Sequence, residues 1–207
     1  MANITLFSQI ISKLDRSKFK KLVDEKQTDK HNKGFTSWTH LVSMLFCQFA
    51  KSQSLRDISN GLRSATGNLN HLGIDRAPSK STISYQNKNR NWEIFRDYYY
   101  QLLQSLGQHP SFKQTKFHIK SKIFLLDATT ISLCLSLFDW AKYKTKKGAV
   151  KIHALLDYVS HLPACINITD DKIADIKGAY YFPLLKGNVI VADLFYNYFS
   201  LMNFLEA

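Results

Sequence analysis

The chain of 207 residues suits one large domain or two small ones, and its apolar share of 45% supports a packed core and excludes a wholly disordered chain. Lys and Arg exceed Asp and Glu by 12, and both halves of the chain are basic, which favours a polyanionic partner such as nucleic acid over the alternative of a basic protein without one. No apolar run approaches the roughly 18 residues of a membrane-spanning helix, so an anionic membrane surface is the weaker expectation.

The first 110 residues are expected to form an all-helical domain, 1–110. Helical spacing of the apolar residues predicts a helix over 4–14 and a second, short one that opens with Phe19 and Leu22. A third helix is predicted from a cap at Thr36 or Ser37 to Phe49, and a fourth after a cap at Ser54. The third of these is apolar nearly all round, which favours a central place in a bundle. A further helix from Trp92 to Leu106 carries an aromatic stripe at the helical period, which predicts core packing rather than base stacking.

A polar helix is predicted after Pro78, because proline followed by serine is a helix-start signal. With the helix before it and a glycine-containing break over 67–73, the segment 54–90 has the ingredients of a helix-turn-helix. A polar surface helix of an ordinary bundle fits equally well, and both interpretations stay open. Under the first, the candidate DNA contacts are Lys80, Lys88 and Arg90.

After Pro110 the apolar period changes from 3.6 to 2, which indicates strands and a second domain over 115–207. Strands are expected at 123–127, 131–137, 149–156, 164–168 and 189–192, with a glycine turn over 142–148, a short helix near 170–178 and an amphipathic helix over 196–205. Three strands followed by a helix and a further strand indicate a mixed sheet flanked by helices. The predicted fold class is therefore α+β.

Two of the expected strands end in an aspartate, Asp127 and Asp193. If the strands are neighbours in one sheet, the two carboxylates could meet. Hard carboxylate oxygens are what Mg²⁺ or Mn²⁺ prefers, whereas zinc would call for His or Cys. The alternative to a metal role is that each aspartate caps the helix or turn that follows it.

The three cysteines are the remaining candidate metal ligands. Cys47, Cys134 and Cys165 lack zinc-site spacing and are expected to be reduced core thiols of a cytoplasmic protein.

The residues around the two aspartates resemble a known family. Asp127 opens Asp-Ala-Thr-Thr-Ile, and the block Phe138-Asp-Trp-Ala-Lys-Tyr-Lys-Thr-Lys-Lys-Gly-Ala-Val-Lys-Ile-His-Ala-Leu-Leu-Asp157 comes soon after. In order there follow Leu162-Pro, Asp175-Ile and Val189-Ile-Val-Ala-Asp193-x-x-Tyr196-Asn, and upstream lie Gln53-Ser-Leu-Arg-Asp57 and Ala77-Pro-Ser-Lys-Ser-Thr82. Over nearly the whole chain, these blocks resemble insertion-sequence DDE transposases of the insertion-sequence-four group.

The resemblance implies a ribonuclease H-like fold and a DNA cut-and-paste reaction. In this family two Mg²⁺ ions held by two Asp and one Glu activate water, and then a 3′-hydroxyl, for in-line displacement. By position, Asp127 matches the first acid and Asp193 the second, both as catalytic metal ligands for Mg²⁺ or Mn²⁺. The implied partners are double-stranded DNA at transposon ends and a second copy of the chain in a homodimer, and no membrane contact is implied. The implied location is the nucleoid in the bacterial cytoplasm.

The family's third acid has no match. Its Glu lies in a Tyr-Arg-Glu-Lys signature that is absent here, Glu206 is the only acid after Asp193, and the sequence ends 14 residues beyond that aspartate. Leu194 stands where the family usually has a basic residue. The resemblance therefore predicts a transposase truncated before the catalytic Glu, with an incomplete ribonuclease H-like domain and no activity of its own. Two alternatives stay open: a catalytically dead DNA-binding protein that competes for transposon ends, and a metal-dependent nuclease unrelated to transposition.

Further candidate contacts lie in the matched block. The densest basic cluster could touch phosphates, with a solvated turn as the equal alternative: Lys142, Lys144, Lys146, Lys147 and Lys151. His153 could contact DNA or lie near the metal, but a partly buried strand histidine is the stronger expectation. Asp157 and Asp175 could lie near the site and are not assigned as ligands.

Overall fold

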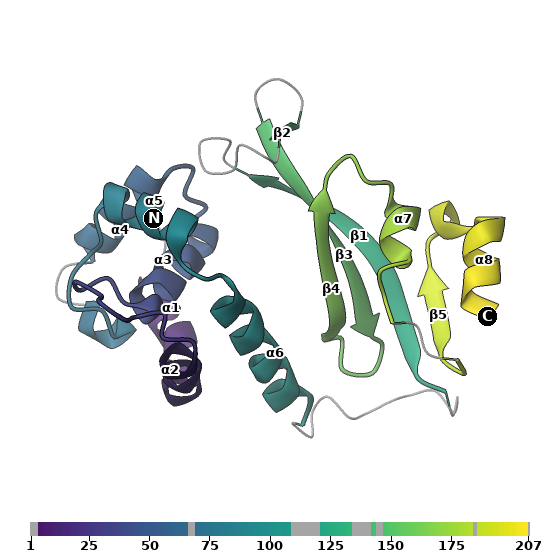
Figure 1. The fold of residues 1–207 in the computed structure, drawn as a ribbon, viewed down its shortest axis with the longest axis horizontal. Coiled ribbons are helices and arrows are strands. Elements are labelled where there is room, and N and C mark those ends of the chain that lie inside the picture. The colour runs from purple at the N-terminus through teal and green to yellow at the C-terminus, as the bar shows by residue number, and fades with distance from the viewer. Residues whose placement is uncertain are drawn as a thin grey trace. The chain divides into compact units, whose positions relative to one another are not determined.

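The computed structural model describes residues 4–65, 69–108, 121–133, 142–143, 147–183 and 186–206 (Figure 1). The chain divides into two units, Met1–Gln101 and Leu102–Ala207. The first unit is helical, and the second contains a β-sheet with short helices. The division between them falls inside helix α6, Glu93–Gly107.

The helical unit begins its helices at side-chain caps. Thr36 and Ser54 cap α3 and α4, as the sequence predicts, by accepting a hydrogen bond from the backbone N–H three residues on. Asp15 and Ser79 cap α2 and α5 in the same way. The elements of this unit are α1 (Ile4–Ser12), α2 (Arg16–Glu25), α3 (Ser37–Phe49), α4 (Leu55–Ser64), the 3₁₀ helix η1 (Leu69–Leu72), α5 (Lys80–Asn89) and most of α6.

Aromatic side chains form much of the core of the helical unit. The ring of Phe19, which is buried, lies 5.7 Å from the ring of Trp38 and 4.9 Å from that of Tyr98. Tyr98 belongs to the aromatic stripe of α6, so the stripe is confirmed as core at this position. Trp92 precedes α6 and is 64% exposed, so the first residue of the expected stripe lies on the surface instead.

The second unit has strands β1 (Ile123–Leu133), β2 (Lys142–Tyr143), β3 (Lys147–Asp157), β4 (Pro163–Asp170) and β5 (Val189–Ala192). β3 pairs antiparallel with β1 along one edge and with β4 and β2 along the other, and β5 lies parallel to β1 on its far side. Figure 1 shows β5 as the outer strand beside β1. The sheet is therefore mixed, as expected.

One strand boundary differs from the prediction. Residues 123–133 form the single strand β1, where the sequence predicts separate strands over 123–127 and 131–137. No Gly or Pro interrupts this run, and the β-branched residues Thr129 and Thr130 favour extended backbone. β1 stays paired with β3 throughout, so Asp127 lies in the middle of a strand and not at its end. Residues 134–137 lie outside the described residues.

Helices cover one face of the sheet. After β4 the chain forms α7 (Asp175–Ala179), and after β5 it forms the 3₁₀ helix η3 (Leu194–Tyr196) and α8 (Phe199–Glu206). Their apolar side chains share one buried cluster with the sheet: Leu126, Leu155, Ala179, Phe182, Tyr196 and Leu201. The predicted α+β class is confirmed, and the strands and helices are consistent with a ribonuclease H-like sheet. Within the described ranges, no helix combines the length and apolarity of a membrane span.

Candidate functional site

Asp127 lies in β1, and Asp193 directly follows β5, the parallel neighbour of β1. The register of β1 and β5 pairs Ile123 with Val189 and runs to Leu126 paired with Ala192. Asp127 and Asp193 are the residues that directly follow this last pair, and the backbones of neighbouring strands are about 4.8 Å apart. Side chains at directly opposed positions point to the same face of a sheet. The fold thus brings together two acids that are far apart in sequence.

Both carboxylates are exposed and largely unengaged. Asp193 Oδ1 accepts a hydrogen bond of 3.3 Å from the backbone N–H of Phe195 and caps η3. The capping role considered as an alternative is therefore real for one oxygen of Asp193. Asp127 makes no hydrogen bond and no ion pair with the described residues, and at mid-strand it caps nothing. At least three of the four carboxylate oxygens remain open to a ligand.

The donor set fits a hard divalent cation. Mg²⁺ is commonly bound by one or two carboxylates, with water and substrate phosphate oxygens completing its shell, and Mn²⁺ also suits carboxylate and water ligands. Within the described residues, no three His, Cys, Asp or Glu side chains form a cluster that could hold a metal ion by themselves. Asp127 and Asp193 would therefore hold such an ion together with ligands from outside these residues.

His153 lies on the covered side of the sheet and is fully buried. Thr169 donates its hydroxyl proton to the Asp170 carbonyl, so the His153 Nε2–H is the donor in the 2.9 Å bond to Thr169 Oγ1. His153 Nδ1 has no partner among the described residues and faces Gly178, where a Cβ atom would collide with the ring. Burial, and then the charge of Lys151, lower the pKa of His153 against the opposing effect of Asp175. A side chain this deep cannot contact DNA, so His153 is structural.

Lys151 is held by the protein. Its Nζ lies 2.7 Å from Asp175 Oδ1 and donates a 2.8 Å hydrogen bond to the carbonyl of Ile173, and its side chain is 16% exposed. These contacts make Lys151 a poor phosphate ligand, contrary to the expectation from sequence. The other members of the cluster are not described: Lys144 and Lys146 lie outside the described residues, as do the side chains of Lys142 and Lys147.

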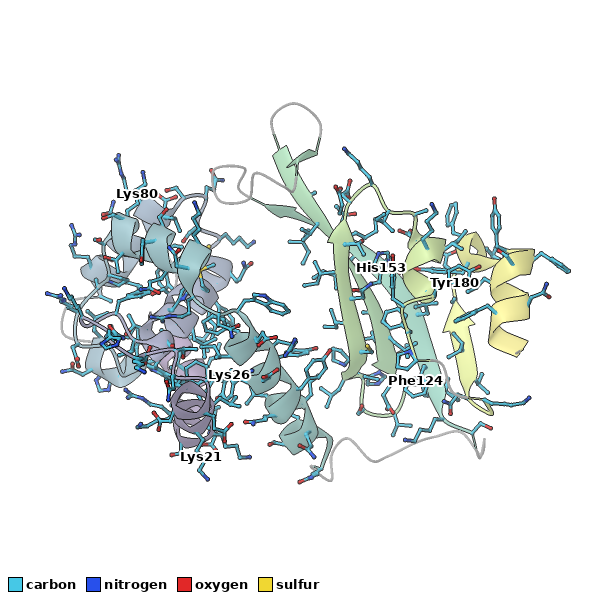
Figure 2. All side chains as sticks on the ribbon, viewed as in Figure 1. Lys21, Lys26, Lys80, Phe124, His153 and Tyr180 are labelled. Atoms are coloured by element: carbon cyan, nitrogen blue, oxygen red, sulfur yellow. The ribbon has the colours of Figure 1, made fainter. Side chains whose placement is uncertain are left out.

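In the helical unit, the three predicted DNA contacts differ in exposure. Lys80 and Lys88 are exposed on α5, and Figure 2 shows Lys80 reaching away from the helix. The Arg90 side chain is 3% exposed, donates a 2.7 Å hydrogen bond to the Phe35 carbonyl and lies 3.6 Å from Asp29. This burial inside the unit disfavours Arg90 as a DNA contact.

The geometry of a tight helix-turn-helix is also absent. α4 and α5 pack against each other, but residues 65–79 separate them and include η1. A helix-turn-helix joins its helices by three or four residues. Next to the start of α5 the surface has a hollow of about 340 Å³, whose cations Lys33 and Arg76 the sequence analysis did not single out. It is lined by Lys33, Gly34, Phe35, Arg76, Ala77, Pro78, Ser79 and Thr82.

Comparison with protein families matches the two ends of the chain separately. Residues 2–75 match a domain of unknown function (DUF4372), and residues 118–207 match the transposase DDE domain. The two matches indicate an insertion-sequence DDE transposase. No curated protein and no solved structure matches the chain.

Both acids lie within the range that matches the transposase DDE domain. The DDE domain match includes β1, which contains Asp127, and β5, which Asp193 directly follows. Transposases with a DDE domain generally use divalent metal ions, which agrees with the open carboxylates. Helix α5, with Lys80 and Lys88, lies between the two matched ranges.

Proposed function

We propose that this chain binds double-stranded DNA at transposon ends and that Asp127 and Asp193 hold Mg²⁺ or Mn²⁺ as two of the three acids that strand cleavage and transfer require. The observation that carries the proposal is the register of β1 and β5, whose last pair directly precedes the two acids, within the range matched by the transposase DDE domain. A structural role alone does not require two exposed carboxylates at one level of adjacent strands, because like charges at that distance repel.

The residues of the site would act by position. Asp127 is paired with Ala154 of β3, and β1 is paired with β5 up to Leu126, so the backbone on both sides supports Asp127. Asp193 is fixed by the η3 turn that it caps. Metal ions bound there would lower the pKa of the attacking oxygen and stabilise the leaving oxygen of a phosphodiester. The two carboxylates serve as ligands and need not transfer a proton.

The 207 residues include no Tyr-Arg-Glu-Lys signature to supply a third carboxylate. These residues alone are therefore proposed to bind metal and DNA without cutting a strand. In that state they would occupy transposon ends and compete with an enzyme that has all three acids. Cleavage of transposon-end DNA by this polypeptide, lost in Asp127→Asn, would contradict this part of the proposal.

The proposed DNA contacts of the helical unit are exposed cations near α5. Lys80 and Lys88 project from the helix, and Lys33 and Arg76 line the hollow beside its first turn. With a net charge of +12 on the chain, binding to phosphates should release counterions and weaken steeply as salt is raised. An affinity for duplex DNA that stays level with salt would argue against these contacts.

A Mn²⁺ titration tests the metal site. Free Mn²⁺ is followed by electron paramagnetic resonance in the wild type, Asp127→Asn and Asp193→Asn. We expect each variant to lose the tightest site, because an amide oxygen is a neutral and weaker ligand. Asp171→Asn is the control, since its amide oxygen can still accept the 3.0 Å hydrogen bond from Thr130 Oγ1. Equal Mn²⁺ binding by all four proteins would exclude a metal site at Asp127 and Asp193.

A further inference from the structure

A group of large apolar side chains lies exposed on η3 and α8. We call Leu194, Phe195, Tyr198, Phe199 and Met202 the η3–α8 patch. Leu194 is 85% exposed, Phe195 is 80% exposed and Phe199 is 82% exposed, and the other two side chains are also exposed. Single apolar side chains on a surface are ordinary, but a contiguous apolar patch marks a site of interaction.

The sheet unit holds α8 by one side only. Leu201 is 1% exposed and belongs to the apolar cluster that the helices share with the sheet. Tyr180, directly after α7, donates its hydroxyl proton to Ser200 Oγ at 3.0 Å, and its ring lies 4.9 Å from the ring of Phe204. These contacts fix which side of the helix faces inward.

The patch occupies the opposite side of α8 and the turn before it. With 3.6 residues per turn, Phe199 and Met202 lie on the side away from these contacts. The N–H of Met202 donates a 3.0 Å hydrogen bond to the Tyr198 carbonyl, which places Tyr198 one turn before Met202. The two remaining members of the patch belong to η3. All five side chains therefore come from the short stretch 194–202.

The patch is large enough for a stable interface between proteins. An aromatic side chain has about 150 to 250 Å² of surface to bury, so three aromatic residues, a leucine and a methionine at these exposures present roughly 700 Å². The largest apolar patch on a typical monomer measures about 300 to 600 Å². Stable interfaces bury about 600 to 1,000 Å² on each partner. The patch therefore reaches the area that a dimer needs.

The patch is almost uncharged, although the chain is strongly basic. Among residues 187–205 only Asp193 carries a charge, whereas 21% of the whole chain is charged. This stretch has no Lys or Arg to attract the phosphates of DNA. A helix that lies in a membrane surface carries Lys or Arg on its polar face, and α8 has neither. Two copies can meet here without the repulsion that a net charge of +12 causes elsewhere.

From these observations we infer that the η3–α8 patch is the surface through which two copies of this chain associate as a homodimer. Protein interfaces are enriched in aromatic residues and Met and are depleted of charge at their centre, as the patch is. A twofold axis through the patch would pack the same side chains of both copies against each other. The inference does not depend on the proposed binding of metal or DNA.

Sedimentation velocity of the whole chain at several protein concentrations tests this interface. We expect the wild type to form a dimer whose affinity does not fall at high salt, since salt does not screen apolar burial. Phe195→Ser combined with Phe199→Ser should weaken the dimer by at least about 30-fold, the effect of losing one aromatic hot spot.

The matched control is Tyr85→Ser combined with Trp92→Ser. It also removes two exposed aromatic side chains, each 64% exposed, but from the helical unit, and it should dimerise as the wild type does. Both double variants should keep the thermal unfolding midpoint of the wild type to within a few degrees, because the replaced side chains are exposed.

Four outcomes would overturn the inference. The first is a wild type that stays monomeric at every concentration, and the second is a dimer that Phe195→Ser with Phe199→Ser leaves intact. The third is a dimer that high salt dissociates, since bridging nucleic acid would then hold the copies together. The fourth is a monomeric wild type that binds phosphatidylglycerol vesicles through the patch. The Mn²⁺ titration of Asp127→Asn bears only on the proposed function, so the two can fail separately.

Discussion

Gly178 is packed directly against the imidazole of His153. A Cβ atom there would collide with the ring, and His153 cannot easily move because it is fully buried and bonded to Thr169. We expect Gly178→Ala to destabilise the sheet unit by about 2 kcal/mol, as overpacking typically does. Urea denaturation measures this. Gly107→Ala is the control, since a Cβ at Gly107 meets no atom within 4 Å, and equal midpoints for both variants would contradict the account.

His40 should make the helical unit sensitive to mild acid. Burial is the main cause that lowers the pKa of His40 to about 4; the 2.6 Å contact with Asn87 Oδ1 opposes it, and the charge of Arg90 adds to it. In the unfolded chain this histidine takes up its proton near pH 6.5. Between pH 6.5 and about 4 the unfolded state therefore binds more protons than the folded state, and the free energy of unfolding decreases as the pH is lowered. The loss is at most about 3 kcal/mol at the acid end of this window.

The measurement is urea denaturation at several pH values, for the wild type and for His40→Gln. The variant removes the titrating ring and keeps an amide that can bond to Asn87. We expect the stability difference between pH 7 and pH 4.5 to be smaller in the variant. An identical pH dependence in both proteins would mean that His40 does not stay neutral in the folded state.

At the scale of single residues, the sequence shows which side chains are charged but does not predict which of them the fold buries. Arg90 and Lys151 were expected to face DNA, but each lies inside a unit and pairs with an acid distant in sequence, Asp29 and Asp175 respectively. No local pattern indicates these partners, because they come from other elements. Lys33 and Arg76 were missed for the same reason: only the fold brings them to one hollow beside α5.

At the scale of elements, α5 is the segment of the helical unit proposed to contact DNA. We expect Lys80→Ala combined with Lys88→Ala to lower the slope of log affinity against log salt by about 2, since each lost phosphate contact removes about 0.9. Binding to labelled duplex DNA at several salt concentrations gives the slope. The control is Lys20→Ala on α2, whose Nζ is paired with Asp24 at 2.7 Å. Equal slopes for the double variant and the control would exclude α5 as the contact.

Local signals decided which elements could be predicted. The caps Thr36 and Ser54 start helices because their side chains bond their own helix, which a sequence window contains. The two strands predicted around Asp127 are one, because pairing with β3 continues the strand past the aspartate. The helix expected from Tyr196 begins at Phe199, since Asp193 first caps the 3₁₀ turn η3. Tertiary pairing, which no local pattern contains, set the first of these boundaries, and a local cap set the second.

For the molecule as a whole, the α+β class followed from the change of apolar period near Pro110. The meeting of Asp127 and Asp193 could be predicted only on the condition that their strands are neighbours. The parallel pairing of β1 with β5 meets that condition, and it depends on the crossover through α7 that no sequence motif specifies. The roles of the two acids remain the proposal to be tested.

Anomalous diffraction from crystals of the whole chain grown with Mn²⁺ tests the central claim most directly. We expect a manganese peak within coordination distance of both the Asp127 and the Asp193 carboxylates, and no such peak in Asp127→Asn crystals. Crystals in which these two carboxylates stay free of manganese, or in which the ion binds only elsewhere, would contradict it.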